Sequence, residues 1–163
     1  MRRAELSDTD TVVDLWNEAA NWLADRTDQW QYPVRIDGIK NAIRTGSVWL
    51  LSGDQAEIAT VTLDEQADPH LWFESDNPAD ALYVHRLIVA RNHGGHGLGS
   101  KILDWASDQS FTQHRSWLRL DAWTTNVQLH DYYLQQGFHL VRVVHDAGPS
   151  GAVFQRRSAT VIG

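Results

Sequence analysis

The sequence contains no cysteine and only one methionine among its 163 residues. The absence of cysteine excludes a disulfide framework, a cysteine-type zinc site and a thiol nucleophile. No apolar stretch approaches the length of a membrane span, and the first residues, MRRAELSDTD, turn acidic where a signal peptide needs an apolar region. We therefore expect a cytoplasmic protein with no membrane partner.

Positive charge is also scarce, because 14 Lys and Arg residues face 21 Asp and Glu residues, for a net charge of −7 with neutral histidines. This balance disfavours non-specific binding to nucleic acid and favours a cationic partner. Residues 91–101 are an exception, since they contain Arg91 and Lys101 and no acidic side chain. A basic island on an acidic protein suggests a small ligand that carries phosphate.

The remaining composition is that of a soluble globular protein, with 42% hydrophobic and 21% charged residues. No repeat or linker divides the chain, and we expect a single domain over residues 1–163. Apolar periodicity and turn residues predict alternating strands and helices, and hence an α/β fold with a mixed sheet. The predicted strands are 2–6, 47–53, 56–64, 81–89, 116–123, 138–144 and 152–156; the predicted helices follow Ser7 or Asp8 and cover 34–45, 97–109 and 127–136.

A glycine-rich segment follows the predicted strand 81–89. Residues 90–106 read ARNHGGHGLGSKILDWA and hold four glycines and two histidines. Glycine lets the backbone approach a ligand closely, and the first amides of a helix suit an anion. The alternative is a glycine-rich turn without a ligand. A Walker A loop is excluded because Ser100 and Lys101 stand in the wrong order, and a dinucleotide fingerprint is excluded because the glycines of 95–99 have the wrong spacing.

A third interpretation fits this segment better. VARNHGGHGLGSKIL, 89–103, resembles the acyl-CoA loop of the GCN5-related N-acetyltransferase (GNAT) superfamily, in which a strand is followed by R/Q-x-x-G-x-G/A at the start of a helix. Gly97 and Gly99 take the two small positions, whereas Gly94 stands where the family usually has Arg or Gln. This departure puts a side-chain contact from position 94 in doubt, but not a backbone cradle.

A second motif agrees with the first. LRLDAWTTNVQLHDYYLQQGF, 118–138, resembles the later GNAT motif of a strand, an Asn, a helix that carries Tyr, and Gly-Phe, at Asn126, Tyr133, Gly137 and Phe138. The resemblance implies a GNAT fold of α+β type, with a central mixed, mostly antiparallel β-sheet flanked by about four helices. It implies acetyl-CoA as co-substrate, bound by Leu87, Ile88, Val89, Gly94, Gly95, His96, Gly97, Leu98, Gly99, Ser100, Asn126 and Tyr133. Asn126 has an alternative role as the cap of the helix that starts at residue 127.

The catalytic groups follow partly from the resemblance and partly from the residues. Tyr133 stands where the family often has a general acid; the alternative is a half-buried aromatic. Strand alternation places His85 on one face with Tyr83, Leu87 and Val89, where His85 is a candidate base or a core histidine. Asp121 is a candidate anchor for a cationic acceptor, or a partner of Arg119. His70, Glu74, Asp76 and a water chain remain open as alternatives for the base.

The acceptor site has aromatic candidates. Trp22, Asp28, Trp30 and Tyr32 would form an aromatic pocket with a carboxylate, which suits a cationic amine, or they pack the helices onto the sheet. We count Trp30, Tyr32, Tyr83 and Trp123 as substrate-binding candidates. The positions of His85 and His93 at a strand end do not favour a metal site, and no metal is expected.

These observations predict an acetyl-CoA-dependent N-acetyltransferase that acts on the primary amine of a small molecule by direct attack, because no cysteine is present to hold the acyl group. Two alternatives stay open. One is another donor on the same fold, such as another acyl-CoA or an aminoacyl-tRNA, although the acidic charge argues against tRNA. The other is a non-catalytic CoA-binding module. Analogy with the family adds a homodimer.

Overall fold

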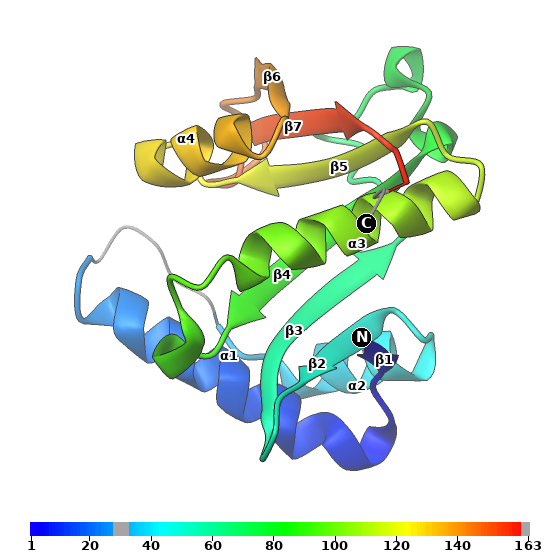
Figure 1. Cartoon of the computed structure of the whole chain (residues 1–163). Helices are drawn as coiled ribbons and strands as arrows, with labels where there is room; N and C mark the ends of the chain where they lie inside the picture. Colours follow the sequence, from blue (N-terminus) through cyan, green and yellow to red (C-terminus); the bar gives the residue numbers. More distant parts are fainter. Residues whose placement is uncertain (28–32, 161–163) are drawn as a thin grey trace. The chain divides into compact units, whose positions relative to one another are not determined.

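The computed structural model describes residues 1–27 and 33–160. Within these ranges the strands and helices follow the predicted order along the chain (Figure 1). The strands are β1 (Arg2–Arg3), β2 (Val48–Ser52), β3 (Glu57–Asp64), β4 (Ala81–Val89), β5 (Trp117–Ala122), β6 (His139–Val143) and β7 (Ala152–Arg157). The α-helices are α1 (Thr9–Ala24), α2 (Ile36–Arg44), α3 (Leu98–Thr112) and α4 (Val127–Gln135). Short 3-10 turns cover Leu6–Asp8, Glu74–Asp76, Pro78–Asp80 and Arg91–His93.

The seven strands form one sheet in the order β1-β2-β3-β4-β5-β7-β6. β4 and β5 are parallel, with Ala81–Val84 opposite Trp117–Leu120, and the helix α3 is part of the crossover between them. The pairs β1/β2, β2/β3, β5/β7 and β6/β7 are antiparallel. The predicted α/β class with a mixed, mostly antiparallel sheet is therefore confirmed.

The chain divides into two compact units. The first consists of residues 1–63 and 86–99, and the second of residues 64–85 and 100–163. The expectation of a single domain over 1–163 stays a prediction. None of the helices that the structure describes is long and apolar enough to span a membrane.

In the core of the first unit, two helices pack against two strands. The buried side chains of α1 recur at helical spacing, which gives the helix one apolar face, and those of α2 do the same. These faces pack on inward-facing residues of β2 and on the end of β4. The cluster comprises Ala4, Val12, Leu15, Trp16, Ile39, Ile43, Val48, Leu50 and Ala90.

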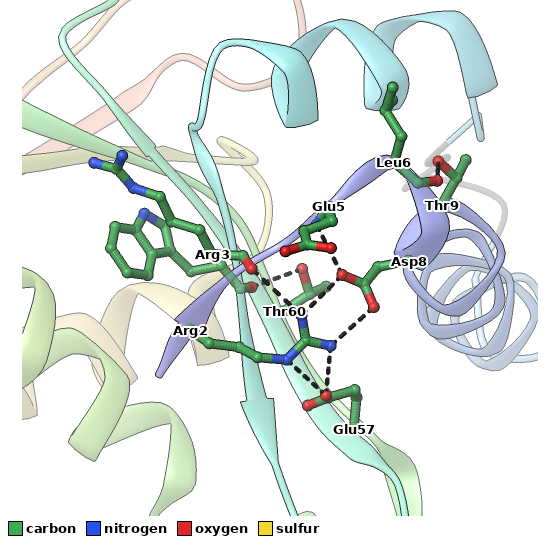
Figure 2. A network of polar contacts seen from close by, with 9 residues as sticks. Arg2, Arg3, Glu5, Leu6, Asp8, Thr9, Glu57 and Thr60 are labelled. Carbon is green, nitrogen blue, oxygen red and sulfur yellow. Dashed lines mark hydrogen bonds and ion pairs between the residues drawn. The ribbon is translucent and has the colours of Figure 1, made fainter.

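A surface network ties the first strand to the first unit. The guanidinium of Arg2 contacts Asp8 at 2.8 Å through both terminal nitrogens and Glu57 at 2.7 and 3.0 Å (Figure 2). The Asp8 carboxylate also accepts a hydrogen bond from the backbone amide of Glu5 at 2.7 Å. This turn at Leu6–Asp8 ends the strand at Arg3, earlier than the predicted 2–6.

The second unit is organised around a buried arginine. Arg119 on β5 is 2% exposed, and it donates hydrogen bonds to Asp76 O at 2.6 Å and Gln155 Oε1 at 3.0 Å. It also donates to Asn77 O at 3.4 Å and to the Tyr83 hydroxyl at 3.2 Å. The long connection between β3 and β4 is thereby attached to the second unit, where Leu71 and Trp72 join its core.

Candidate active site

The glycine loop, residues 94–97, adopts a backbone that other residues avoid. Gly95 has φ of +78° and Gly97 has φ of +71°, in the left-handed region that glycine tolerates best. An added Cβ at either position would meet no atom of residues 1–27 and 33–160 within 4 Å, so packing against these residues does not explain the glycines. The loop is exposed and leads directly into α3 at Leu98. A backbone of this kind fits a phosphate group, whose oxygens need close amide donors.

Gly94 differs from its neighbours in the loop. Its φ of −64° is ordinary for any residue, and an added Cβ would lie 3.3 Å from the carbonyl oxygen of Arg91. A side chain at position 94 would therefore require a small shift of the turn. The tight approach is a local reason for glycine where the GNAT motif usually has Arg or Gln.

Arg91, at the start of the loop, is held by α1 within the first unit. Its guanidinium stacks on the Trp22 ring at 3.8 Å from the centroid, and its backbone amide donates to Glu18 Oε2 at 3.1 Å. Glu18 and Trp22 are one helical turn apart, so a single face of α1 binds both ends of Arg91. Trp22, which the sequence suggested for an acceptor pocket, thus contacts the glycine-loop segment, and its role in an acceptor pocket stays a prediction.

The polar side chains around the loop contact mainly their own surroundings. His93 Nδ1 lies 2.8 Å from Asn92 Oδ1, and His96 Nδ1 lies 3.3 Å from His93 O. Lys101 is exposed. In the second unit, the Ser100 hydroxyl donates to Gln136 Oε1 at 2.6 Å, which links the first turn of α3 to the residue after α4.

The strand β4 is irregular at Arg86, whose φ of +52° is unusual for a residue with a side chain. This conformation interrupts the alternation of faces, so the face of Tyr83 and His85 does not extend by counting to Leu87 and Val89. Ile88 packs against the core cluster of the first unit. Strand periodicity alone was therefore a poor guide to this part of the sequence.

His85 is paired with a carboxylate that the sequence analysis did not select. His85 Nε2 lies 3.1 Å from Oδ1 of Asp64, the last residue of β3, and the two side chains are 28% and 18% exposed. The same Oδ1 accepts a hydrogen bond from the backbone amide of Gln66 at 2.8 Å. The sequence held one signal for Asp64, a carboxylate at the end of the strand that precedes the strand of His85. Such carboxylates are too common to indicate a partner for the histidine.

Asp121 is also in the second unit, and its carboxylate accepts a hydrogen bond from the Ser150 hydroxyl at 2.5 Å. Burial raises the pKa of the Asp121 carboxyl above its ordinary value, although the Ser150 hydrogen bond and the positive charge of a protonated His85 act in the opposite direction. The alternative in which Asp121 pairs with Arg119 is wrong, because Arg119 donates to Asp76 O, Asn77 O, Tyr83 and Gln155.

Tyr133 lies on α4 with 9% of its surface exposed, and its ring contacts Phe138 and Phe154 at centroid distances of 5.8 Å. Asn126 caps the same helix, since its Oδ1 accepts the amide hydrogen of Leu129 at 3.1 Å. The capping role that the sequence left open for Asn126 is therefore present. Its side-chain amide group still has donors for a ligand, and its role in CoA binding stays a prediction.

Among the acceptor-site candidates, Tyr83 is 1% exposed and its hydroxyl donates to Pro78 O at 2.9 Å. This burial in the core weighs against direct contact with a substrate. Trp123 is partly buried, and its carbonyl oxygen lies 2.9 Å from His130 Nε2. Trp30, Tyr32 and Asp28 lie outside the described residues.

The alternatives for a base in the β3–β4 connection differ in their contacts. Asp76 forms two contacts with the Arg142 guanidinium at 2.6 and 2.9 Å, which hold the pKa of its carboxyl below its ordinary value. His70 and Glu74 are exposed. Within residues 1–27 and 33–160, no group of three or more His, Asp or Glu side chains is arranged to hold a metal ion.

The chain is similar to known acetyltransferases along most of its length. The profile of the acetyltransferase (GNAT) domain matches residues 44–140. An uncharacterized N-acetyltransferase of Bacillus subtilis, YesJ, is 30% identical over 145 residues, which cover 85% of this chain and 80% of that protein. A GNAT-family acetyltransferase of Listeria monocytogenes superimposes with a TM-score of 0.81 at 21% identity, over 96% of this chain and 92% of that one.

A further structure, yncA of Salmonella typhimurium with its cofactor acetyl-CoA, has a TM-score of 0.68 at 15% identity and covers 99% of this chain and 95% of that one. At such low identities the two structures support the fold, while the profile and the B. subtilis relative carry the family. The glycine loop before α3, the order of the elements and the mixed sheet agree with them. The chain therefore belongs to the GNAT acetyltransferase family.

Proposed function

We propose that this protein is an acetyl-CoA-dependent N-acetyltransferase that acetylates the primary amine of a small molecule by direct attack. The observation that carries the proposal is the glycine loop of a GNAT family member, with left-handed backbone at Gly95 and Gly97 and, among the described residues, no atom within 4 Å of an added Cβ at either position. The amides of this loop would bind the pyrophosphate of acetyl-CoA, with Arg91 and Lys101 adding positive charge. Bound acetyl-CoA supplies the acetyl group as a thioester.

The reaction needs two proton transfers. The acceptor enters as an ammonium ion and must lose a proton before its nitrogen can attack, and the sulfur must gain a proton as the carbon–sulfur bond breaks. We assign the first role to His85 as general base and the second to Tyr133 as general acid, because a tyrosine hydroxyl keeps its proton at neutral pH. In balance, an ammonium ion and acetyl-CoA yield an acetamide, CoA thiol and one proton.

The nature of the acceptor is supported by charge. The net charge of −7 favours a cationic substrate, and Asp64 and Asp121 place carboxyl groups near His85 in the second unit. We propose Asp121 as the anchor of the acceptor ammonium, and Trp123 as an aromatic wall. A tRNA donor would need a broad basic face, which this composition does not favour.

The first experiment is a calorimetric titration of the full chain with acetyl-CoA, desulfo-CoA and ATP. Micromolar binding of both CoA compounds with weak binding of ATP would support the donor site. A screen of tryptamine, agmatine and spermidine for CoA release would then test turnover. Binding without turnover of any amine favours a non-catalytic module, and the absence of CoA binding would contradict the proposal.

The loop is tested by a pair of variants with equal backbone strain. Gly97→Ala and Gly46→Ala both place a side chain at a φ near +70°, and each should destabilise the fold by about 1–2 kcal/mol. Only Gly97→Ala should weaken acetyl-CoA binding, by about tenfold or more, because relief of that strain displaces amides that contact phosphate. Equal dissociation constants in the two variants would remove the loop from the binding site.

A further inference from the structure

We propose that Asp64 is a positioning residue for His85: it fixes the imidazole with its proton on Nε2 and leaves Nδ1 as the atom that takes the proton of the acceptor ammonium. This inference rests on the proposed function and deepens it. It begins from the contact of 3.1 Å between Asp64 Oδ1 and His85 Nε2, within the second unit.

The contact determines which ring nitrogen carries the proton. An ionised carboxylate only accepts hydrogen bonds, so the neutral imidazole must donate from Nε2 to Asp64. Its Nδ1 then holds a lone pair, and within the described part of the chain Nδ1 has no hydrogen-bond partner. A lone pair without a protein partner on a partly exposed imidazole is the arrangement that a general base requires.

Asp64 is itself held in place. Its Oδ1 accepts the backbone amide of Gln66 at 2.8 Å, so the carboxylate is oriented by the turn that follows β3. A hydrogen-bonded chain therefore runs from a backbone amide through a carboxylate to an imidazole. Such a chain limits rotation of both side chains and stabilises the imidazolium that forms on proton uptake.

Asp121 is less suited to the same task. Its carboxylate is buried and accepts the Ser150 hydroxyl at 2.5 Å, and its charge interacts with His85 and Asp68. The groups that face His85 are therefore Asp64 from β3 and Asp121 from β5, with Asp68 acting on Asp121. Of these three carboxylates, Asp64 is the one hydrogen-bonded to the imidazole, which leaves Asp121 for the acceptor ammonium.

The proton step balances without any further reactant. The ammonium nitrogen gives one proton to His85 Nδ1, and the imidazolium is then stabilised by the Asp64 carboxylate. The freed amine attacks the thioester carbon as the bond between that carbon and sulfur breaks. After the hydroxyl of Tyr133 has protonated the sulfur, the second proton of the attacking nitrogen restores Tyr133, and His85 releases its proton to water.

The test is a ¹⁵N NMR measurement on histidine-labelled full chain, with His85→Gln to assign the signal. With a neutral imidazole in the unmodified protein, the shifts should report a protonated Nε2 and an unprotonated Nδ1. Asp64→Leu, which removes the acceptor, should give a mixture of the two tautomers. A protonated Nδ1 in the unmodified protein, or an unchanged tautomer in Asp64→Leu, would overturn the inference.

Kinetics with an amine from the screen above provide the second measurement. Asp64→Asn should lower kcat by about 10–100-fold, because the imidazolium that forms on proton uptake loses its carboxylate partner. Asp68→Asn is the matched control: it removes a carboxylate charge nearby, keeps an acceptor for the His70 amide, and should change kcat less than about twofold. A control variant as slow as Asp64→Asn would assign the effect to general charge and overturn the inference.

Failure of the proposed function is distinguished from failure of this inference by the acetyl-CoA titration. Both Asp64→Asn and the unmodified chain should bind acetyl-CoA with the same affinity. If neither binds it, the transferase proposal fails and the role of Asp64 in an acetyl transfer fails with it, whatever the tautomer. If both bind it and the tautomer differs from expectation, only the role of Asp64 is wrong.

Discussion

Arg2 and Arg119 are each the centre of a hydrogen-bond network, in opposite environments. The side chain of Arg2 is 42% exposed and binds two carboxylates, Asp8 and Glu57. Arg119 is 2% exposed and binds four neutral oxygens, while its guanidinium stacks on Trp72 at 4.6 Å. The number of contacts is therefore a poor measure of stabilisation, because water competes for the hydrogen bonds of Arg2 and does not reach those of Arg119.

The largest expected effect is that of Arg119→Met. Its loss removes the donor that the structure gives to Asp76 O and to Gln155 Oε1 and leaves a void at a buried side chain, and we expect the free energy of unfolding to fall by about 3–5 kcal/mol. Urea denaturation measures this change. The control is Arg157→Met, an exposed guanidinium over the Trp117 ring at 4.2 Å, which should cost about 1 kcal/mol or less. Equal losses of unfolding free energy in the two variants would contradict the larger contribution of the buried arginine.

Arg2→Met should have a smaller effect that depends on pH. The Arg2 hydrogen bonds lower the pKa of the Asp8 carboxyl to about 2. A lowered pKa means that the folded state favours the ionised form, so this stabilisation is present above about pH 4 and is lost as the pH falls towards 2. At pH 7 the variant should lose about 1 kcal/mol, a value reduced by solvent screening at an exposed site.

Unfolding curves of both proteins between pH 2 and 7 measure that difference, which should shrink at the acidic end. The Arg119→Met difference involves neutral acceptors and should stay nearly constant as long as both proteins fold. A constant difference for Arg2→Met across this range would show that Asp8 is not the group that Arg2 stabilises.

Salt should produce the smallest effect. At 1 M NaCl the Debye length falls to about 3 Å, so the Arg2→Met difference should decrease by a few tenths of a kcal/mol, whereas the Arg119→Met difference should stay within error. Paired denaturation curves at about 0.1 and 1 M salt make the measurement. A decrease of equal size in both variants would mean that the buried guanidinium also depends on long-range charge.

Much of the fold was predictable because it depends on local patterns. The predicted helices 34–45 and 127–136 each stop before a glycine, and these glycines, Gly46 and Gly137, have φ of +72° and +80° in the structure. The alternation of β-rich runs and helical spacing predicted every strand and α-helix that the structure describes. The first strand was predicted too long, since a turn at Leu6–Asp8, whose Asp8 carboxylate accepts hydrogen bonds from Arg2 and from the Glu5 amide, follows the strand Arg2–Arg3.

The candidate site was predictable only where it depends on local backbone. The glycine loop was found by spacing, since left-handed conformations select glycine whatever surrounds them. The carboxylate of Asp64 was missed because it meets His85 through sheet formation across 21 residues. The break in alternation before Leu87 and Val89 was not predicted, because the left-handed conformation of Arg86 has no sequence signal.

The sequence by itself determined the order of the elements, the glycine loop and the family, all of which follow from residues close together in the chain. The tertiary structure alone decided which partner each polar group contacts: Asp64 contacts His85, Asp121 contacts Ser150, and Arg119 contacts neutral oxygens. The physical reason is one of range. Backbone preferences are set within a few residues, whereas a buried or half-buried polar group takes whichever partner the packing of distant strands brings within hydrogen-bonding distance.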